Sequence, residues 1–165
     1  MEEATTLGPL AKAPLRDAIL QQGEKLREAG AEELFRGKVP SPKGYFVPPM
    51  VVRATKDTMQ TLRNEEIFGP LAVVTEVENI DEAIRLANAS RYGLGSAVFT
   101  RDAKEAERAV RTLDAGLTFI NEMVVSEAAL PFGGVKASGI GRELGTEGLL
   151  EWVSAKSVAQ TGFDT

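Results

Sequence analysis

Hydrophobic side chains recur at three- and four-residue spacing between residues 14 and 29. This is the period of one face of an α-helix, and it predicts a helix over 14–29. Pro14 suits the first turn, where its missing N–H leaves no hydrogen bond unmade, and Gly30 is a typical stop. Gly23 in the interior weakens the helix by about 1 kcal/mol relative to alanine. We therefore expect packing against a sheet to stabilise it.

Two short extended segments follow this helix. Residues 34–36 and the stretch from Tyr45 onward flank the turn-rich residues 40–44, Pro-Ser-Pro-Lys-Gly. Extended runs on either side of such a turn predict an antiparallel hairpin.

Strand-like and helix-like segments alternate at nearly even spacing between residues 71 and 121. Asp81 is the expected N-cap of one helix, and Asp102 with Glu105 forms a capping-box-like start for the next. Such β-α-β-α-β alternation implies parallel strands with right-handed crossovers. The expected fold class is α/β, a layered α/β/α domain with a mainly parallel sheet. The expected strands are 71–77, 95–100 and 117–121, and the expected helices are 81–89 and 102–113.

The pattern stops after Asn121 and leaves about twenty glycine-rich residues without clear periodicity, a length at which loops tend to be functional. A last helix is expected over 143–153, interrupted by Gly145 and Gly148. Residues 157–160 resemble a strand that pairs with another subunit. We therefore expect a main domain over 1–153 and a terminal oligomerisation-type strand and tail over 154–165.

Composition narrows the possible functions. The formal net charge of −5 over 165 residues opposes binding to phosphate backbones, so nucleic acid is not an expected partner. Apolar runs are far shorter than the roughly 20 residues that cross a bilayer, and the acidic start Met1-Glu2-Glu3 has the wrong sign for a signal peptide. We therefore expect a cytoplasmic location and no membrane association.

The sequence contains no cysteine and no histidine. Disulfides, thiolate nucleophiles, thiolate metal sites and imidazole bases are thereby excluded. Any group that titrates near neutral pH must be a perturbed carboxylate or lysine. Catalysis by this chain alone is therefore severely restricted.

Glu66 and Phe68 precede the strand expected at 71–77. Side chains two residues apart in an extended segment face the same way. A carboxylate accepts hydrogen bonds from ribose hydroxyls, and an aromatic ring offers an apolar face to a flat heterocycle. The alternative interpretation is a solvated glutamate beside a core phenylalanine.

The glycine-rich stretch 131–142 invites comparison with a phosphate-binding loop. Residues 139–145 read GxGxxxG, one residue too long for the dinucleotide fingerprint, and they do not follow a strand. We instead expect these glycines to allow positive backbone angles where the chain turns closely against something.

Hydrolytic chemistry has little support. Ser126 has no histidine to activate it, so a hydrolase triad is excluded. The carboxylates offer an acid/base pair in principle, although scattered surface acids are the commoner explanation. The glutamates concerned are Glu65, Glu66, Glu122 and Glu127.

Several short motifs together resemble the ordered C-terminal signatures of NAD(P)-dependent aldehyde dehydrogenases. With Gly8-Pro9-Leu10 near the start, the resemblance covers nearly the whole chain. Residues 126–134 look most like the succinate-semialdehyde branch. The motifs are Glu65-Glu66-Ile67-Phe68-Gly69-Pro70, Ala87-Asn88, Tyr92-Gly93-Leu94, Phe119-Ile120-Asn121, Pro131-Phe132-Gly133-Gly134-Val135-Lys136, Ser138-Gly139 and Gly141-Arg142-Glu143.

The resemblance implies a role for five residues. Glu66 would hold the nicotinamide ribose of NAD or NADP, Phe68 would pack beside the nicotinamide end, and Leu94 would line the cofactor cleft. Phe132 would form part of the aldehyde tunnel. Ser126 would help to hold the distal carboxylate of a succinate-semialdehyde-like substrate.

One departure from the family is plain. Its nucleophilic cysteine, its general-base glutamate and its cofactor domain lie upstream of the matched segment. We therefore expect this chain to supply walls to the site, to hold no catalytic residue and no metal, and to be inactive and cofactor-free alone. The expected partners are a small aldehyde in the intact enzyme and either another copy or a missing N-terminal part. The alternatives are a non-catalytic assembly module and, more remotely, a carboxylate-based hydrolase.

Overall fold

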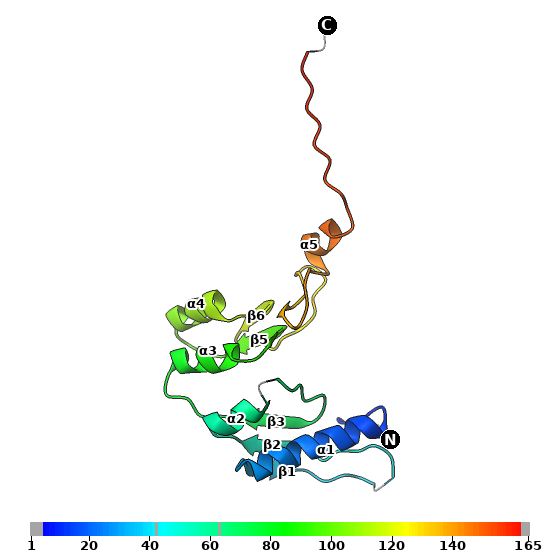
Figure 1. Ribbon diagram of the computed structural model, residues 1–165, viewed down its shortest axis with the longest axis vertical. Coiled ribbons are helices and arrows are strands. Elements are labelled where there is room, and N and C mark those ends of the chain that lie inside the picture. Colours follow the sequence, from blue (N-terminus) through cyan, green and yellow to red (C-terminus); the bar gives the residue numbers. More distant parts are fainter. Residues whose placement is uncertain (1–4, 42, 63, 163–165) are drawn as a thin grey trace. The chain divides into compact units, whose positions relative to one another are not determined.

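The computed structural model describes residues 5–41, 43–62 and 64–162 (Figure 1). The chain divides between Asn79 and Ile80 into two compact units, and each is described by itself. In the described residues, no helix has the length and apolar character needed to span a membrane.

The first unit is built from one long helix and a small sheet. Helix α1 spans Ala13–Glu28, within one residue of the prediction at each end, with a proline in its first turn. Gly30 follows at φ 92°, the left-handed conformation typical of a helix stop. The predicted packing of this helix against a sheet is confirmed by a shared core. That core consists of Ile19, Leu26, Ala31, Val47, Met50, Val52 and Leu71.

The sheet has the order β1-β2-β3. Strand β1, Glu32–Arg36, pairs antiparallel with β2, Met50–Arg53, which confirms the hairpin. Strand β2 begins five residues later than Tyr45, because Pro48 and Pro49 carry no N–H for a ladder. Strand β3, Leu71–Val74, is parallel to β2 and shorter than predicted.

Helix α2, Lys56–Leu62, connects β2 to β3 and was not predicted. Its start was legible in the sequence, because the Thr55 hydroxyl accepts from the backbone N–H of Thr58 at 3.1 Å, as an N-cap does. The buried Thr58 hydroxyl donates to the carbonyl of Ala29 at 3.1 Å and so ties α2 to the end of α1.

The second unit begins with helix α3, Ile80–Asn88, and continues through β4, Tyr92–Gly93, and β5, Gly95–Val98. Helix α4, Ala103–Thr112, then connects β5 to β6, Leu117–Ile120, and the two strands run parallel. Strand β7, Val135–Lys136, pairs antiparallel with β4, and the short helix α5 spans Gly145–Leu150.

The single mainly parallel sheet predicted from the alternation is not seen in the described residues. Strand β3 pairs with β2, whereas β5 and β6 form a separate two-stranded sheet. The alternation correctly predicted β3, α3, β5, α4 and β6 but missed the two-residue strand β4, and it carried no information about which strands pair. The fold is therefore mixed α/β with small sheets.

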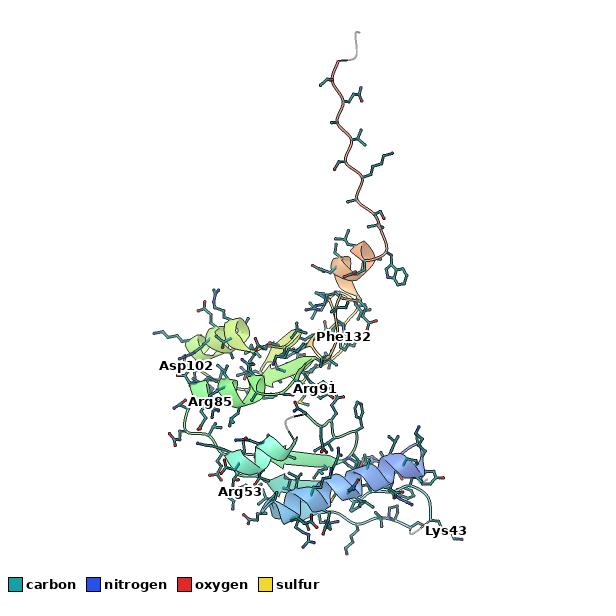
Figure 2. All side chains as sticks on the ribbon, in the orientation of Figure 1. Lys43, Arg53, Arg85, Arg91, Asp102 and Phe132 are labelled. Carbon is teal, nitrogen blue, oxygen red and sulfur yellow. The ribbon has the colours of Figure 1, made fainter. Side chains whose placement is uncertain are left out.

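The predicted helix caps had different outcomes. Asp102 is the N-cap of α4 (Figure 2), and its carboxylate accepts from the N–H of Lys104 at 2.7 Å. Glu105 accepts from the Thr100 hydroxyl at 2.7 Å. The N-cap prediction for Asp81 was wrong, because α3 begins at Ile80 and Asp81 lies in its first turn, where it pairs with Arg108 of α4.

The C-terminal helix is shorter than the predicted 143–153, because residues 143 and 144 lie outside it and Leu144 takes a φ of 63°. The described residues after it, 151–162, are exposed and form neither helix nor strand within this single chain. Pairing of residues 157–160 with another subunit stays a prediction, as does the boundary at 153.

Candidate functional site

A cavity of about 640 Å³ lies in the second unit and brings two of the predicted site residues together. Leu94 follows β4, and Phe132 lies on the segment between β6 and β7 (Figure 2). Both side chains line the cavity, and Trp152 and Arg142 line it as well. Leu94 is 43% exposed, so its side chain is available to a ligand. The lining glycines are Gly133, Gly134, Gly139 and Gly141.

Phe132 is held by a two-way backbone pairing. Its N–H donates to the carbonyl of Glu143 at 2.7 Å, and the N–H of Glu143 donates to the carbonyl of Phe132 at 2.7 Å. This pair closes the glycine-rich stretch between them into a loop with a fixed base. The aromatic ring therefore stands at a defined place on the cavity wall.

The Arg142 guanidinium forms hydrogen bonds within the same loop. Its Nη1 donates to the carbonyls of Gly134 at 2.9 Å and Gly141 at 2.7 Å. A Cβ atom on Gly133 would meet the backbone carbonyl oxygen of Gly141 at 2.6 Å and the Arg142 side chain at 2.9 Å, so this position has no room for a larger residue. Arg142 thus holds the loop by hydrogen bonds that a shorter side chain would not reach.

Leu94 is fixed through its backbone. The carbonyl of Leu94 accepts from the N–H of Leu117 at 3.0 Å, and the N–H of Gly93 donates to the hydroxyl of Ser138 at 2.9 Å. Leu94 therefore lies between the start of β6 and the glycine-rich loop. The structure explains in this way how residues far apart in the sequence reach one cavity.

The predicted use of the glycines is confirmed at three positions. Gly139, Gly141 and Gly145 have φ values of 140°, 73° and 59°, which L side chains rarely adopt. These angles let the chain reverse between Phe132 and α5.

Glu66 and Phe68 lie in the first unit, and both are exposed. Ile67 between them packs against the core, so the two flanking side chains face away from it. Phe68 is 68% exposed, and the alternative of a core phenylalanine was therefore wrong. Both side chains are therefore accessible, and their role toward a cofactor stays a prediction.

The other candidate residues are less constrained. Ser126 lies in the exposed stretch 121–130 that precedes Phe132. The Glu65 carboxylate accepts from Lys25 at 3.2 Å and from Gln22 at 3.4 Å, which gives it a structural role on α1. An acid/base function for the glutamates stays a hypothesis.

The sequence model of the aldehyde dehydrogenase family matches residues 1–158. The chain belongs to the aldehyde dehydrogenase family. Among curated relatives, succinate-semialdehyde dehydrogenase [NADP(+)] 1 of Mycobacterium ulcerans is 45% identical over 155 residues, which cover 93% of this chain and 33% of the relative. Succinate-semialdehyde dehydrogenase [NADP(+)] of Deinococcus radiodurans is 43% identical over 157 residues, with 95% and 33% covered.

Solved structures agree with this assignment. The succinic semialdehyde dehydrogenase of Streptococcus pyogenes in complex with NADP+ superposes with a TM-score of 0.84 at 37% identity, over 93% of this chain and 34% of that one. Apo betaine aldehyde dehydrogenase of Staphylococcus aureus superposes with a TM-score of 0.83 at 37% identity, over 94% and 32%. This aldehyde dehydrogenase chain spans about a third of the length of these relatives.

Sequence reasoning did not predict the parts that Arg142, Ser138 and Trp152 play in this aldehyde dehydrogenase chain. Arg142 and Ser138 were noticed only as members of family motifs, because no local pattern shows which backbone groups a side chain will reach. Trp152 had one usable signal, since it is the sole tryptophan and lies four residues after Gly148, the last glycine before it.

Proposed function

We propose that this chain is the C-terminal part of an NAD(P)-dependent aldehyde dehydrogenase of the succinate-semialdehyde type. In the intact enzyme it forms walls of the cofactor and aldehyde sites, where an aldehyde is oxidised to a carboxylic acid. The observation that carries the proposal is the shared cavity of Leu94, proposed to face the cofactor, and Phe132, proposed to face the aldehyde. The similarity to succinate-semialdehyde dehydrogenases supports the choice of substrate.

The proposed roles follow from the chemistry of each side chain. Glu66 accepts hydrogen bonds from the nicotinamide ribose, Phe68 packs beside the nicotinamide end, and Leu94 lines the cofactor cleft. Phe132 lines the aldehyde tunnel, and the Ser126 hydroxyl donates to the distal carboxylate of the substrate. When bound, NAD or NADP supplies the hydride acceptor.

The reacting atom must come from elsewhere. Aldehyde oxidation in this family begins with attack by a thiolate, and this sequence contains no cysteine. We therefore propose that the chain alone has no dehydrogenase turnover and that it acts together with a part that holds the thiol and the cofactor domain.

A chimaera tests this proposal. The matching C-terminal third of the Mycobacterium ulcerans relative would be replaced by this chain, and NADP reduction would be followed with succinate semialdehyde. We expect turnover in the chimaera and none in the chain alone. A folded chimaera that lacks activity, or activity in the verified chain alone, contradicts the proposal.

Paired variants of the chimaera test the residue roles. Glu66→Gln is expected to raise KM for NADP about tenfold, because a charged hydrogen-bond acceptor is lost. Glu65→Gln is the matched control, since Glu65 contacts Lys25 and Gln22 of α1. Equal effects of the two substitutions would remove the proposed role of Glu66.

A second candidate function, the assembly module, has one observation in its favour. Large apolar side chains on and after α5 are exposed: Leu149 by 72%, Leu150 by 60%, Trp152 by 90% and Val153 by 64%. Exposed apolar surface of this kind favours association with another chain. Size-exclusion chromatography with light scattering tests it, and a clean monomer at high concentration counts against assembly.

A further inference from the structure

We propose that Lys136 is a positioning residue of the candidate site, whose ammonium group fastens the glycine-rich loop of Phe132 to the end of helix α3. The contacts of Lys136 are made within the chain and do not depend on the proposed function. Only the identity of the ligand in the cavity rests on the proposed function.

The ammonium group of Lys136 lies at the carboxyl end of α3. Its Nζ donates to the carbonyl of Asn88 at 3.0 Å and to the carbonyl of Ser90 at 3.1 Å. The Asp114 carboxylate lies 3.7 Å away. Carbonyls at a helix end have no partner within the helix, and a lysine can satisfy them. Two of the three donors of the ammonium group are thus hydrogen-bonded to carbonyls, and the carboxylate adds an ion pair.

These contacts argue against a direct catalytic or ligand-binding role for Lys136. It donates to two backbone carbonyls and forms an ion pair with Asp114, and it does not belong to the cavity lining. Any effect on the site must therefore pass through the backbone on either side of it.

The backbone of Lys136 has a conformation that is unusual for a residue other than glycine. Its φ of 55° is in the left-handed region, which costs a non-glycine residue free energy and persists only where the surroundings impose it. Glycine would take this angle without strain. The side chain of Lys136 must therefore contribute contacts that offset the strain.

Lys136 lies between Gly134 and Ser138, which both line the cavity. Its own strand pairs with β4 through Tyr92, and the N–H of Ala137 donates to the carbonyl of Arg91 at 3.0 Å. A loop released at Lys136 would lose its alignment with Leu94, because β4 leads directly into that residue.

The carboxyl end of α3, whose carbonyl accepts from Lys136, is itself held by side-chain hydrogen bonds. The Asn88 side chain donates to the carbonyl of Thr112 at 2.7 Å and accepts from the N–H of Asp114 at 2.8 Å. The end of α3, the end of α4 and the glycine-rich loop thus meet at one junction. Lys136 is the part of this junction that belongs to the loop.

Amide hydrogen exchange of the purified chain, with no ligand added, tests the proposal. In Lys136→Met we expect the amides of Gly93, Ala137 and Ser138 to exchange about tenfold faster, because charge-assisted hydrogen bonds are lost. The amide of Ala106 in α4 is the internal reference and should change less than about twofold. Lys104→Met, an exposed lysine in α4, is the control for loss of a positive charge and should leave the loop amides unchanged.

Two further variants separate the ammonium group from the backbone angle. Lys136→Gly relieves the strain and is expected to speed loop exchange as Lys136→Met does, whereas Lys136→Arg keeps a cation and should restore most of the protection. Wild-type protection in Lys136→Gly or in Lys136→Met overturns the proposal. Should Lys136→Met unfold the whole unit, Lys136→Arg decides, and loop exchange as fast in Lys136→Arg as in Lys136→Gly also overturns it. Failure of the chimaera to turn over would leave these outcomes unaffected.

Discussion

Gly116 and Gly133 lie so close together that a Cβ atom on Gly116 would stand 1.7 Å from the carbonyl oxygen of Gly133. The neighbouring atoms are backbone on both sides, so no side chain can move aside. Gly116 immediately precedes β6, and Gly133 lines the cavity. The approach of these two glycines sets how near the loop of Phe132 comes to the β5-β6 sheet.

Gly116→Ala is therefore expected to destabilise the second unit by about 3 kcal/mol, since a well-packed region must shift its backbone to admit the methyl group. Urea denaturation followed by circular dichroism measures the change. Exchange of the Leu117 amide, which donates to the carbonyl of Leu94, reports whether the loss is centred there. An unchanged midpoint would mean that the two backbones are not fixed against each other.

The same chemical change at Gly23 should have the opposite sign. Gly23 lies inside α1, and an added Cβ would find ordinary contacts at 3.6 Å with Met50 and 3.9 Å with Leu71. Gly23→Ala should stabilise the first unit by up to about 1 kcal/mol, because alanine has the higher helix propensity. Hydrogen exchange of the α1 amides in urea measures the change, and slower exchange is expected in the variant. A loss of stability would show that the added Cβ packs more tightly against Met50 and Leu71 than these distances indicate.

The sequence predicted most of the helices and strands, but little about which strands pair with each other. Helix α1 was predicted because its period, its proline and Gly30 agree. Helix α2 was missed, because seven residues are too few to show a period. The separation of β3 from β5 depends on tertiary contacts, which a local pattern does not contain.

The sequence offered candidate residues for the site, but it did not predict how they lie relative to one another. Leu94 and Phe132 were chosen from family motifs, and their common cavity follows from β4–β7 pairing and from glycines that allow close approach. Arg142 and Lys136 were missed as loop anchors, because their partners are backbone carbonyls. A carbonyl is present at every residue and leaves no signature in the sequence.

The N-cap of α4 offers a third test of stability. Asp102→Ala removes the bond from the Lys104 N–H at 2.7 Å and should cost about 1 kcal/mol. Asp102→Asn keeps a side-chain oxygen and should lose only a small part of this. Urea denaturation of the two variants measures the difference, and equal losses would show that charge rather than the hydrogen bond stabilises this end.

The exposed pair of Glu33 and Arg36 on β1 gives a pH-dependent prediction. Hydrogen bonds from the Arg36 guanidinium, at 2.6 Å to 3.0 Å, hold the pKa of the Glu33 carboxyl below its usual range, and burial opposes this only in part. Because the folded-state pKa is the lower one, the pair stabilises the fold above the unfolded-state pKa. The contribution is lost as pH falls through the folded-state value. Solvent screening keeps it small, since both side chains are well exposed.

Arg36→Gln should therefore raise the pKa of Glu33 toward its ordinary value and weaken the acid dependence of stability. Carboxyl chemical shifts followed by NMR during an acid titration measure the pKa directly. Glu24 is the internal comparison, because the low pKa of its carboxyl arises first from its hydrogen bond to Arg27 and only to a smaller extent from the charge of Arg36, so it should rise less than that of Glu33. A Glu33 pKa that stays low in Arg36→Gln would mean that another group, such as the nearby Arg27 charge, holds it there.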